Sequence, residues 1–317
     1  MSRARGKLCS KVGSRQRWRA LSKTHQAPVR RLEKKKQMTK CKTEGSLAIE
    51  GDDVGEGQSA FAKIAAEVMA SRTPADGESD GTPACCVARC PDQWVGAVRF
   101  EAGRFHCGPM GAASPDGFAW RRATDELSPE GPRRLLMILE SPHIDEFGGD
   151  HQPIGPAAGA TGRNIRALLY DVNVRGLQEL GLSPNGEELD LVLINAIQRQ
   201  TSLGHPPRRF RDSVFRRAWG CPSIGRADFQ GRIAALWRAD AKDIVMNCCT
   251  GAEASKTSLK RLVYDALRDL SDRNAALPPV VIACAHPCSW QRNKRNREAR
   301  VIGHPARLAS LGGGLHV

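Results

Sequence analysis

Four runs of almost continuously apolar residues mark the second half of the chain, at 133–143, 189–198, 242–251 and 280–290. Each run is rich in Val, Ile, Leu or Met, and each closes on polar or small residues. Runs of this length and composition are typical of strands that are buried on both faces. Such strands belong to parallel sheets whose two faces are covered by helices.

The stretches between these runs have helical periodicity. Residues 162–172, two segments within 210–240, and 255–272 place apolar side chains three and four positions apart. Alternating strands and helices predict a doubly wound α/β domain over 131–317, a three-layer α/β/α arrangement around a central, mostly parallel four-stranded sheet. Ligands of such sheets bind outside the carboxyl ends of the strands. The positions expected to converge there are Glu140, Asn195, Gly251 and His286.

The net charge of the chain is concentrated near its N-terminus. The sequence has 317 residues and a formal net charge of +14. Residues 1–42 contain 15 Lys or Arg against the single acid Glu33, which leaves 33 basic and 33 acidic residues for the remainder. We expect this basic tail, 1–43, to be disordered and to attract phosphates. Two other interpretations stay open: a targeting sequence, or an untranslated extension if translation starts at Met38 rather than Met1.

Two further segments lie between the tail and the α/β domain. Residues 44–83, rich in Gly, Asp, Glu and Ser, predict a linker with a short helical patch at 59–70. Residues 84–130 predict a small cysteine-containing accessory segment with a hairpin. No apolar stretch reaches the ~18 residues of a membrane span, and no signal-peptide pattern opens the chain. We therefore expect no membrane partner.

The sequence contains eleven cysteines. An odd number without a secretory pattern favours thiols or metal ligands over a disulfide framework. One group has partial zinc-ligand spacing: Cys85, Cys86, Cys90, His106 and Cys107. Because its second pair lacks the Cys-x-x-Cys form, we expect ordinary reduced cysteines and assign no metal. The cysteines inside apolar runs are expected to be small core residues: Cys248, Cys249 and Cys284.

Polar groups at the ends of the runs carry the candidate chemistry. Glu140 directly follows buried residues, and a buried carboxylate must be paired or functional. Asp145 and Glu146 follow closely and are candidates for the same role. The loop PIGPAAGATGRNI (153–165) leads into the first expected helix. Small residues and free amides at a helix start suit an anion, although a plain strand-to-helix connection also favours Gly and Pro.

Taken in order, ESPH (140–143), PIGPAAGATGRNI, LVLINAIQ (191–198) and AHPCSW (285–290) resemble the successive motifs of the uracil-DNA glycosylase superfamily. The resemblance covers about 134–293. It implies an enzyme of base-excision repair that hydrolyses the N-glycosidic bond of uracil or another altered base, after that base has flipped out of DNA.

The resemblance also implies roles for individual residues. Catalysis falls to Glu140, which would position water and stabilise the sugar cation, and to His286, which would stabilise the departing base. The implied base-binding residues are Asn195, Ser141, Pro142 and Ile154. The implied DNA-binding residues are Gly162, Arg163, Asn164, Ser289, Trp290 and Arg292, with Trp290 as a wedge in the duplex. Other basic residues that flank these strand ends are candidates for phosphate contacts: Arg208, Arg209, Arg211, Lys294, Arg295 and Arg297.

The chain departs from the family pattern at several positions. Ile154 stands where an aromatic residue usually stacks on the base, and Cys288 replaces the usual Ser after His-Pro. Only Cys221 resembles a cysteine of the iron–sulfur branch, so we expect no cluster and no other cofactor. We expect a monomer that binds single- or double-stranded DNA and is cytoplasmic, or nucleoid-associated in a bacterium, with nuclear or organellar location open. A non-catalytic nucleic-acid-binding protein of the same fold and a small-molecule hydrolase stay open as alternatives.

Overall fold

The structure is a computed structural model, and it describes residues 55–71, 87–107, 121–203, 208–238, 242–252, 254–273 and 280–303. These ranges belong to one compact unit, Glu50–Val317. The predictions for the basic tail and for Cys85 and Cys86 lie outside the described residues. So does most of the predicted linker, apart from its helical patch.

The four predicted strands form, and they lie side by side in the order β8-β7-β4-β6. They are β4 (Arg133–Leu139), β6 (Glu188–Asn195), β7 (Ile244–Asn247) and β8 (Val280–Ala283). β4 pairs in parallel with both β6 and β7, and β7 pairs in parallel with β8. The carboxyl ends of all four strands therefore meet at one edge.

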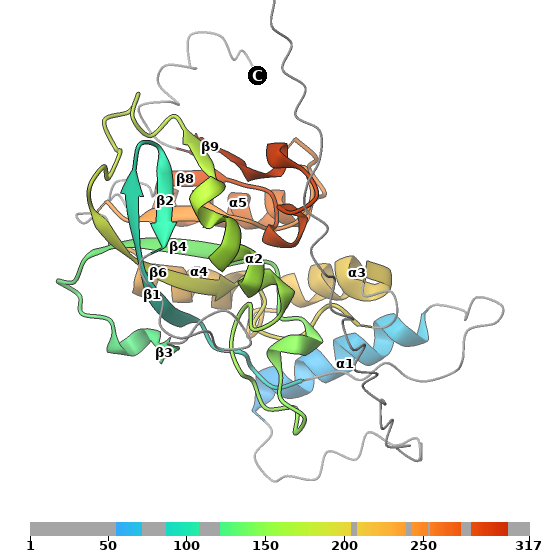
Figure 1. Cartoon of the computed structure of the whole chain (residues 1–317). Coiled ribbons are helices and arrows are strands. Elements are labelled where there is room, and N and C mark those ends of the chain that lie inside the picture. The colour runs from blue at the N-terminus through green and yellow to red at the C-terminus, as the bar shows by residue number, and fades with distance from the viewer. Residues whose placement is uncertain are drawn as a thin grey trace, which may run out of the picture. The chain divides into compact units, whose positions relative to one another are not determined.

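The sheet continues beyond these four strands and closes on itself (Figure 1). β1 (Gln93–Glu101) adds antiparallel to β6, and β9 (Glu298–Gly303) adds antiparallel to β8. β5 (Asn173–Arg175) pairs with β9, and β2 (Arg104–Cys107) pairs with both β5 and β1. The result is a closed mixed barrel of eight strands, with a ninth, β3 (Arg122–Ala123), outside it on β1.

The predicted three-layer α/β/α sandwich is therefore wrong, because the four parallel strands are only part of a closed barrel. The additional strands lack the continuously apolar pattern used to find the first four: β9 alternates exposed and buried residues at its start, and β5 has only three residues. The hairpin predicted within 84–130 does form, as β1 and β2, but it belongs to the barrel. β1 pairs with β6 and β2 pairs with β5, so the hairpin joins the two edges of the sheet. This leaves no open edge with unpaired backbone groups among the described strands of the barrel.

Five α-helices lie within the described ranges (Figure 1). They are α1 (Glu56–Ala70), α2 (Ala160–Leu168), α3 (Arg208–Trp219), α4 (Arg226–Leu236) and α5 (Leu259–Arg273). The helical patch predicted in the linker is part of α1, which buries its apolar face against the core. Short 3-10 helices include η1 (Thr124–Glu126), η2 (Ile144–Glu146), η3 (Leu169–Asp171), η4 (Pro287–Ser289) and η5 (Lys294–Arg297).

Two apolar cores occupy the two faces of the sheet. Leu136 and Ile138 of β4 pack in one core together with residues of α1, α3, α4 and α5. Leu135, Met137 and Leu139 of the same strand pack in the other, with residues of α2 and of the remaining barrel strands. Since successive side chains of a strand point to opposite faces, two covered faces require a continuously apolar strand. This explains the four apolar runs of the sequence.

Candidate functional site

The predicted convergence of strand ends is present. Leu139, the last residue of β4, is paired in register with Asn195, the last residue of β6. Glu140 follows directly, and its Oε2 accepts a 2.8 Å hydrogen bond from the backbone N–H of Thr250, beyond β7. His286 lies three residues beyond the end of β8. Glu140, Asn195 and His286 therefore lie at one edge of the parallel strands.

Glu140 is a buried carboxylate held by two donors. Its side chain lies between the Thr250 amide and the guanidinium of Arg211 on α3, whose Nη1 is 3.1 Å from Oε1. An ionised carboxylate has about four acceptor positions, so each oxygen can accept a further hydrogen bond, for example from water. Glu140 is only 5% exposed, and these two donors compensate for the water that its carboxyl group loses on burial.

Backbone geometry fixes the orientation of the His286 ring. Cys288 N donates to His286 Nδ1 at 3.2 Å, because Pro287 turns the chain into η4 directly after the histidine. A neutral imidazole that accepts at Nδ1 must carry its proton on Nε2. Nε2–H has no partner among the described residues, so it can donate to a ligand.

Electrostatics keep the His286 ring neutral. Burial lowers the pKa of His286 below its ordinary value of 6.5. The negative charge of Glu140 opposes this shift, while the positive charges of Arg211 and Lys260 add to it. The four side chains are therefore close enough to interact electrostatically, and the imidazole near neutral pH is a neutral hydrogen-bond donor.

Asn195 and Glu146 form a second buried polar pair. Asn195 is fully buried, and its Nδ2 donates to Glu146 Oε2 at 3.3 Å. Burial raises the pKa of Glu146 from its ordinary 4.5 to about 7, against hydrogen bonds from the His143 and Ala157 backbone and from Asn195. Asn195 Oδ1 has no hydrogen-bond partner in the part of the chain that the structure describes. A buried acceptor without a hydrogen bond lowers the stability of the folded protein. An N–H group of a ligand could supply the missing hydrogen bond.

Of the cysteines considered for zinc, Cys90 lies beside this pair, with its Sγ 4.0 Å from Asn195 Nδ2. Burial and the nearby Glu146 raise the pKa of its thiol, so Cys90 is protonated. His106 is exposed on β2. The described residues contain no group of three or more side chains placed to hold a metal ion.

The Gly/Pro loop after η2 is fixed against β1. The Ile154 amide donates to Glu146 O at 2.8 Å, and the Ile154 side chain is 44% exposed. Gly155 has φ +143°, and a Cβ added there would lie 2.0 Å from Gln93 Oε1, so only glycine fits. Ala157 is fully buried at φ +57°, a conformation that L-residues rarely adopt. The loop thus positions Glu146 and leaves Ile154 accessible.

Asn164, predicted to contact DNA, has a structural role instead. It is buried in α2, where its Nδ2 donates to Pro287 O at 3.1 Å and its Oδ1 accepts from Gln291 Nε2. Asn164 therefore ties α2 to the turn that carries His286. Gly162 is buried and Arg163 is exposed in the same helix, so of these three predicted contacts only Arg163 presents its side chain to solvent.

The predicted wedge is a core residue. Trp290 is fully buried in the apolar core that contains Leu135, Met137 and Leu139 of β4. Its indole N–H donates to Ala285 O at 2.9 Å. It cannot reach a duplex from this position, and the prediction is corrected. Ser289 donates its hydroxyl to His286 O at 2.8 Å, which closes the turn, and Arg292 is exposed.

Two predicted base-binding residues are also buried. Ser141 Oγ lies 2.5 Å from Thr201 Oγ1, and Pro142 is covered beside it. Their contacts are within the protein, between the end of β4 and the segment after β6. They support the position of Glu140 and do not face solvent in this structure.

Sequence reasoning assigned one cation near the site, Arg211, to another role and missed a second, Lys260. Arg211 was expected to contact phosphate, but it pairs with Glu140. Lys260, in the first turn of α5, is buried and donates its Nζ to Cys284 O. The signal for Arg211 was its place in a basic run near the strand ends. Lys260 lies between Leu259 and Arg261 in an amphipathic helix, and no pattern in the sequence indicated its role.

Comparisons with protein-family models, with curated proteins and with solved structures found no match. Within the described ranges, no helix is both long and apolar enough to cross a membrane.

Proposed function

We propose that this protein hydrolyses the N-glycosidic bond of an altered base in DNA, with Glu140 and His286 acting at opposite ends of the bond. The observation that carries the proposal is the placement of Glu140, whose carboxyl group is held by Thr250 and Arg211, near His286. The His286 ring is neutral, and its Nε2–H has no partner in the described residues. The order of motifs that resemble the glycosylase superfamily supports the same reaction. The closed barrel differs from the sandwich fold that this resemblance implies, so only the residues at the strand ends support the proposal.

Cleavage of an N-glycosidic bond develops positive charge on the sugar and negative charge on the leaving base. Glu140 stabilises the sugar cation and accepts a hydrogen bond from the attacking water. The water oxygen bonds to C1′, the C1′–N bond breaks, and the released proton balances the charge of the departing base. His286 donates its Nε2–H to the base oxygen on which negative charge develops.

A neutral imidazole suits this role because it stabilises the base anion by hydrogen bonding without first forming an ion pair with Glu140. The same burial that lowers the pKa of His286 also strengthens a hydrogen bond made in that environment. Arg211 pairs with Glu140 Oε1 and leaves other acceptor positions of the carboxyl group open.

Asn195 supplies base recognition in this proposal. Its unpaired Oδ1 is suited to a ring N–H of a base, while Nδ2 already donates to Glu146. Glu146 can accept from Asn195 Nδ2 whether or not its carboxyl group is protonated, and it therefore holds the Asn195 amide in one orientation. The exposed Ile154 at the loop provides an apolar surface for the base in place of an aromatic ring.

The test is incubation of the full chain with single-stranded oligonucleotides that carry uracil or other altered bases, followed by alkali to cleave abasic sites. We expect Glu140→Gln and His286→Gln each to lower base release by about 10²-fold or more, since each removes a group that acts in the transition state. Oligonucleotide binding, measured by fluorescence anisotropy, should stay within a few-fold.

Matched controls exist for both substitutions. Glu101→Gln changes an exposed carboxylate that pairs with Arg99 on β1, and His106→Gln changes an exposed imidazole on β2. Both should leave base release unchanged. Absence of base release from every altered base tested, or undiminished release by the two site variants, would refute the proposed reaction.

A further inference from the structure

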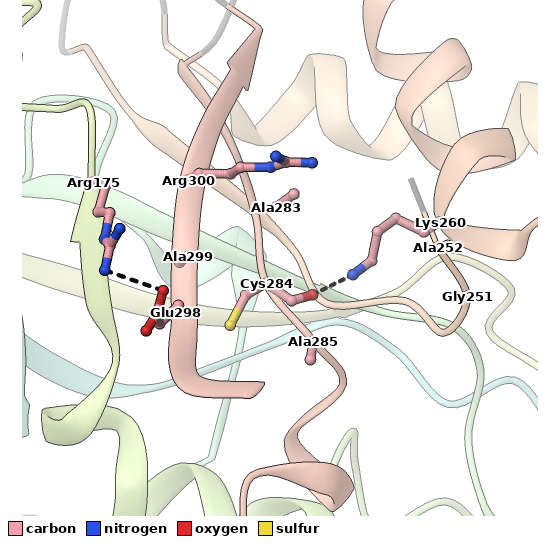
Figure 2. Close-up of a pocket in the computed structure, with 10 residues that line it drawn as sticks. All are labelled: Arg175, Gly251, Ala252, Lys260, Ala283, Cys284, Ala285, Glu298, Ala299 and Arg300. Carbon is pink, nitrogen blue, oxygen red and sulfur yellow. Dashed lines mark hydrogen bonds and ion pairs between the residues drawn. The ribbon is translucent and has the colours of Figure 1, made fainter. Parts of the chain in front are cut away.

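A cavity of about 390 Å³ lies beside the candidate site, where β8, β9 and the start of α5 meet (Figure 2). We call it the β8–β9 cavity. Short side chains make up part of its lining, and its charged side chains come from β5, β9 and α5. The residues that define it here are Gly251, Lys260, Ala283, Ala285, Glu298 and Arg300. Arg175 completes the charged lining.

The charges that line the cavity are mostly positive. Three cations, Arg175, Lys260 and Arg300, face one carboxylate, Glu298. Arg175 Nη2 and Glu298 form an ion pair of 3.2 Å, which Figure 2 shows on one side of β9. The Arg300 side chain extends from β9 toward the side where Lys260 lies (Figure 2). Counted together, these three cations and one carboxylate give the described lining residues a formal net charge of +2, which favours an anion.

Lys260 is the strongest indication of a ligand. The residue is 6% exposed, and it forms no ion pair with a carboxylate of the described residues. Its Nζ donates to Cys284 O, as Figure 2 shows. An ammonium group has three donors, so two stay available after this bond. A buried charge is stable only when it is paired and hydrogen-bonded, so an anion in the cavity would complete the environment of Lys260.

The short side chains in the lining let an anion approach the backbone closely. Ala283 and Ala285 have only a methyl group each, and no aromatic or long apolar side chain lines the described cavity. A ligand without apolar surface, such as a phosphate group, gains nothing from apolar walls and needs charged and polar partners. Lys260 provides a compact point charge, and Arg300 adds the positive charge of a guanidinium to the same lining.

We propose that the β8–β9 cavity binds a phosphate group through Lys260 and Arg300. Two sources share this chemistry: free inorganic phosphate, and a phosphate of a nucleic acid. The position of the cavity allows the second, since Ala285 precedes His286 and Gly251 follows Thr250, the residue that donates to Glu140. Phosphate binding in the cavity does not depend on the proposed hydrolysis, so the two proposals fail separately.

The test is isothermal titration of the full chain with inorganic phosphate at low ionic strength. We expect saturable binding with one phosphate per chain. Arg300→Gln and Lys260→Gln should each weaken binding by about tenfold or more, because each removes a charge-assisted hydrogen bond. Arg300 is exposed, so its substitution keeps the test valid if the buried Lys260 variant is unstable.

The matched control is Arg268→Gln on α5, the helix that carries Lys260. Arg268 is exposed and pairs with Asp265 and Asp269, away from the cavity. Its substitution should leave phosphate affinity unchanged. Lack of saturable phosphate binding, or equal affinity in wild type and Arg300→Gln, would overturn the proposal.

A competition experiment distinguishes the two sources of phosphate. If a short oligonucleotide displaces inorganic phosphate from the wild type, the site takes a nucleic-acid phosphate. In that case Arg300→Gln should also raise the KM for base release with little change in kcat, because the phosphate contact serves binding alone. If phosphate affinity is unchanged by the oligonucleotide, the site takes free phosphate.

Discussion

Glu146 makes the free energy of unfolding of the protein depend on pH. The substitution Glu146→Gln removes this contribution and therefore measures it. The carboxyl group is buried at 4% exposure, and its pKa is raised from 4.5 to about 7 in the folded protein. Between these two values the folded state keeps a proton that the unfolded state releases. Stability therefore falls as pH rises from 4.5 to about 7 and is constant with respect to this group outside that window.

The size of the effect follows from the shift. One pKa unit corresponds to about 1.36 kcal/mol, so the raised pKa of Glu146 costs the wild type about 3 kcal/mol of unfolding free energy above pH 7 relative to pH 4.5. Gln has no proton to lose. The stability of Glu146→Gln relative to wild type should therefore increase by this amount between the two pH values.

Urea unfolding monitored by tryptophan fluorescence at pH 4.5, 6 and 8.5 measures this difference. Other ionisable groups titrate alike in both proteins and cancel in the comparison. Glu101→Gln, which changes an exposed carboxylate on β1, should show no such pH-dependent gain. Parallel stability curves for wild type and Glu146→Gln across this range would refute the assignment of a raised pKa to Glu146.

Three further outcomes are expected. Because burial lowers the pKa of His286, base release should stay constant from pH 8 to below 6.5 and decline only in more acidic buffers; a rise in rate on acidification would contradict a neutral His286. Trp290→Ala should cost about 3–5 kcal/mol of stability in urea unfolding and reduce activity equally on single- and double-stranded substrates, whereas a loss confined to duplex would restore the wedge. Deleting residues 1–42 should flatten the dependence of DNA binding on salt, because 15 basic residues are lost, without changing which base is released; an unchanged slope would assign the tail another role.

The four parallel strands were predictable because both of their faces are covered, which forces a continuous apolar run on each. The closure of the barrel was not. β5 contributes three residues, and β1 mixes buried with partly exposed positions, so neither has a strong pattern of its own. Which strand pairs with which depends on contacts between residues far apart in the sequence, such as Arg104 with Asn173. Local patterns do not contain that information.

The candidate site was predictable to the same extent. Glu140, Asn195 and His286 were found because they end apolar runs, and parallel pairing brings strand ends together. The direction of side chains near those ends was not predictable: Trp290 was expected at the surface and lies in the core. Arg211 was expected to contact phosphate and pairs with Glu140, because the fold brings the start of α3 close to the end of β4.

We propose that Glu140 and His286 act together to break an N-glycosidic bond. The most direct measurement is single-turnover base release from an oligonucleotide that carries uracil, with the other altered bases tested in parallel, by wild type, Glu140→Gln and Glu101→Gln. We expect release by wild type and Glu101→Gln, and a loss of about 10²-fold or more in Glu140→Gln with binding retained. Equal release by Glu140→Gln and wild type, or no release of any base by wild type, would contradict it.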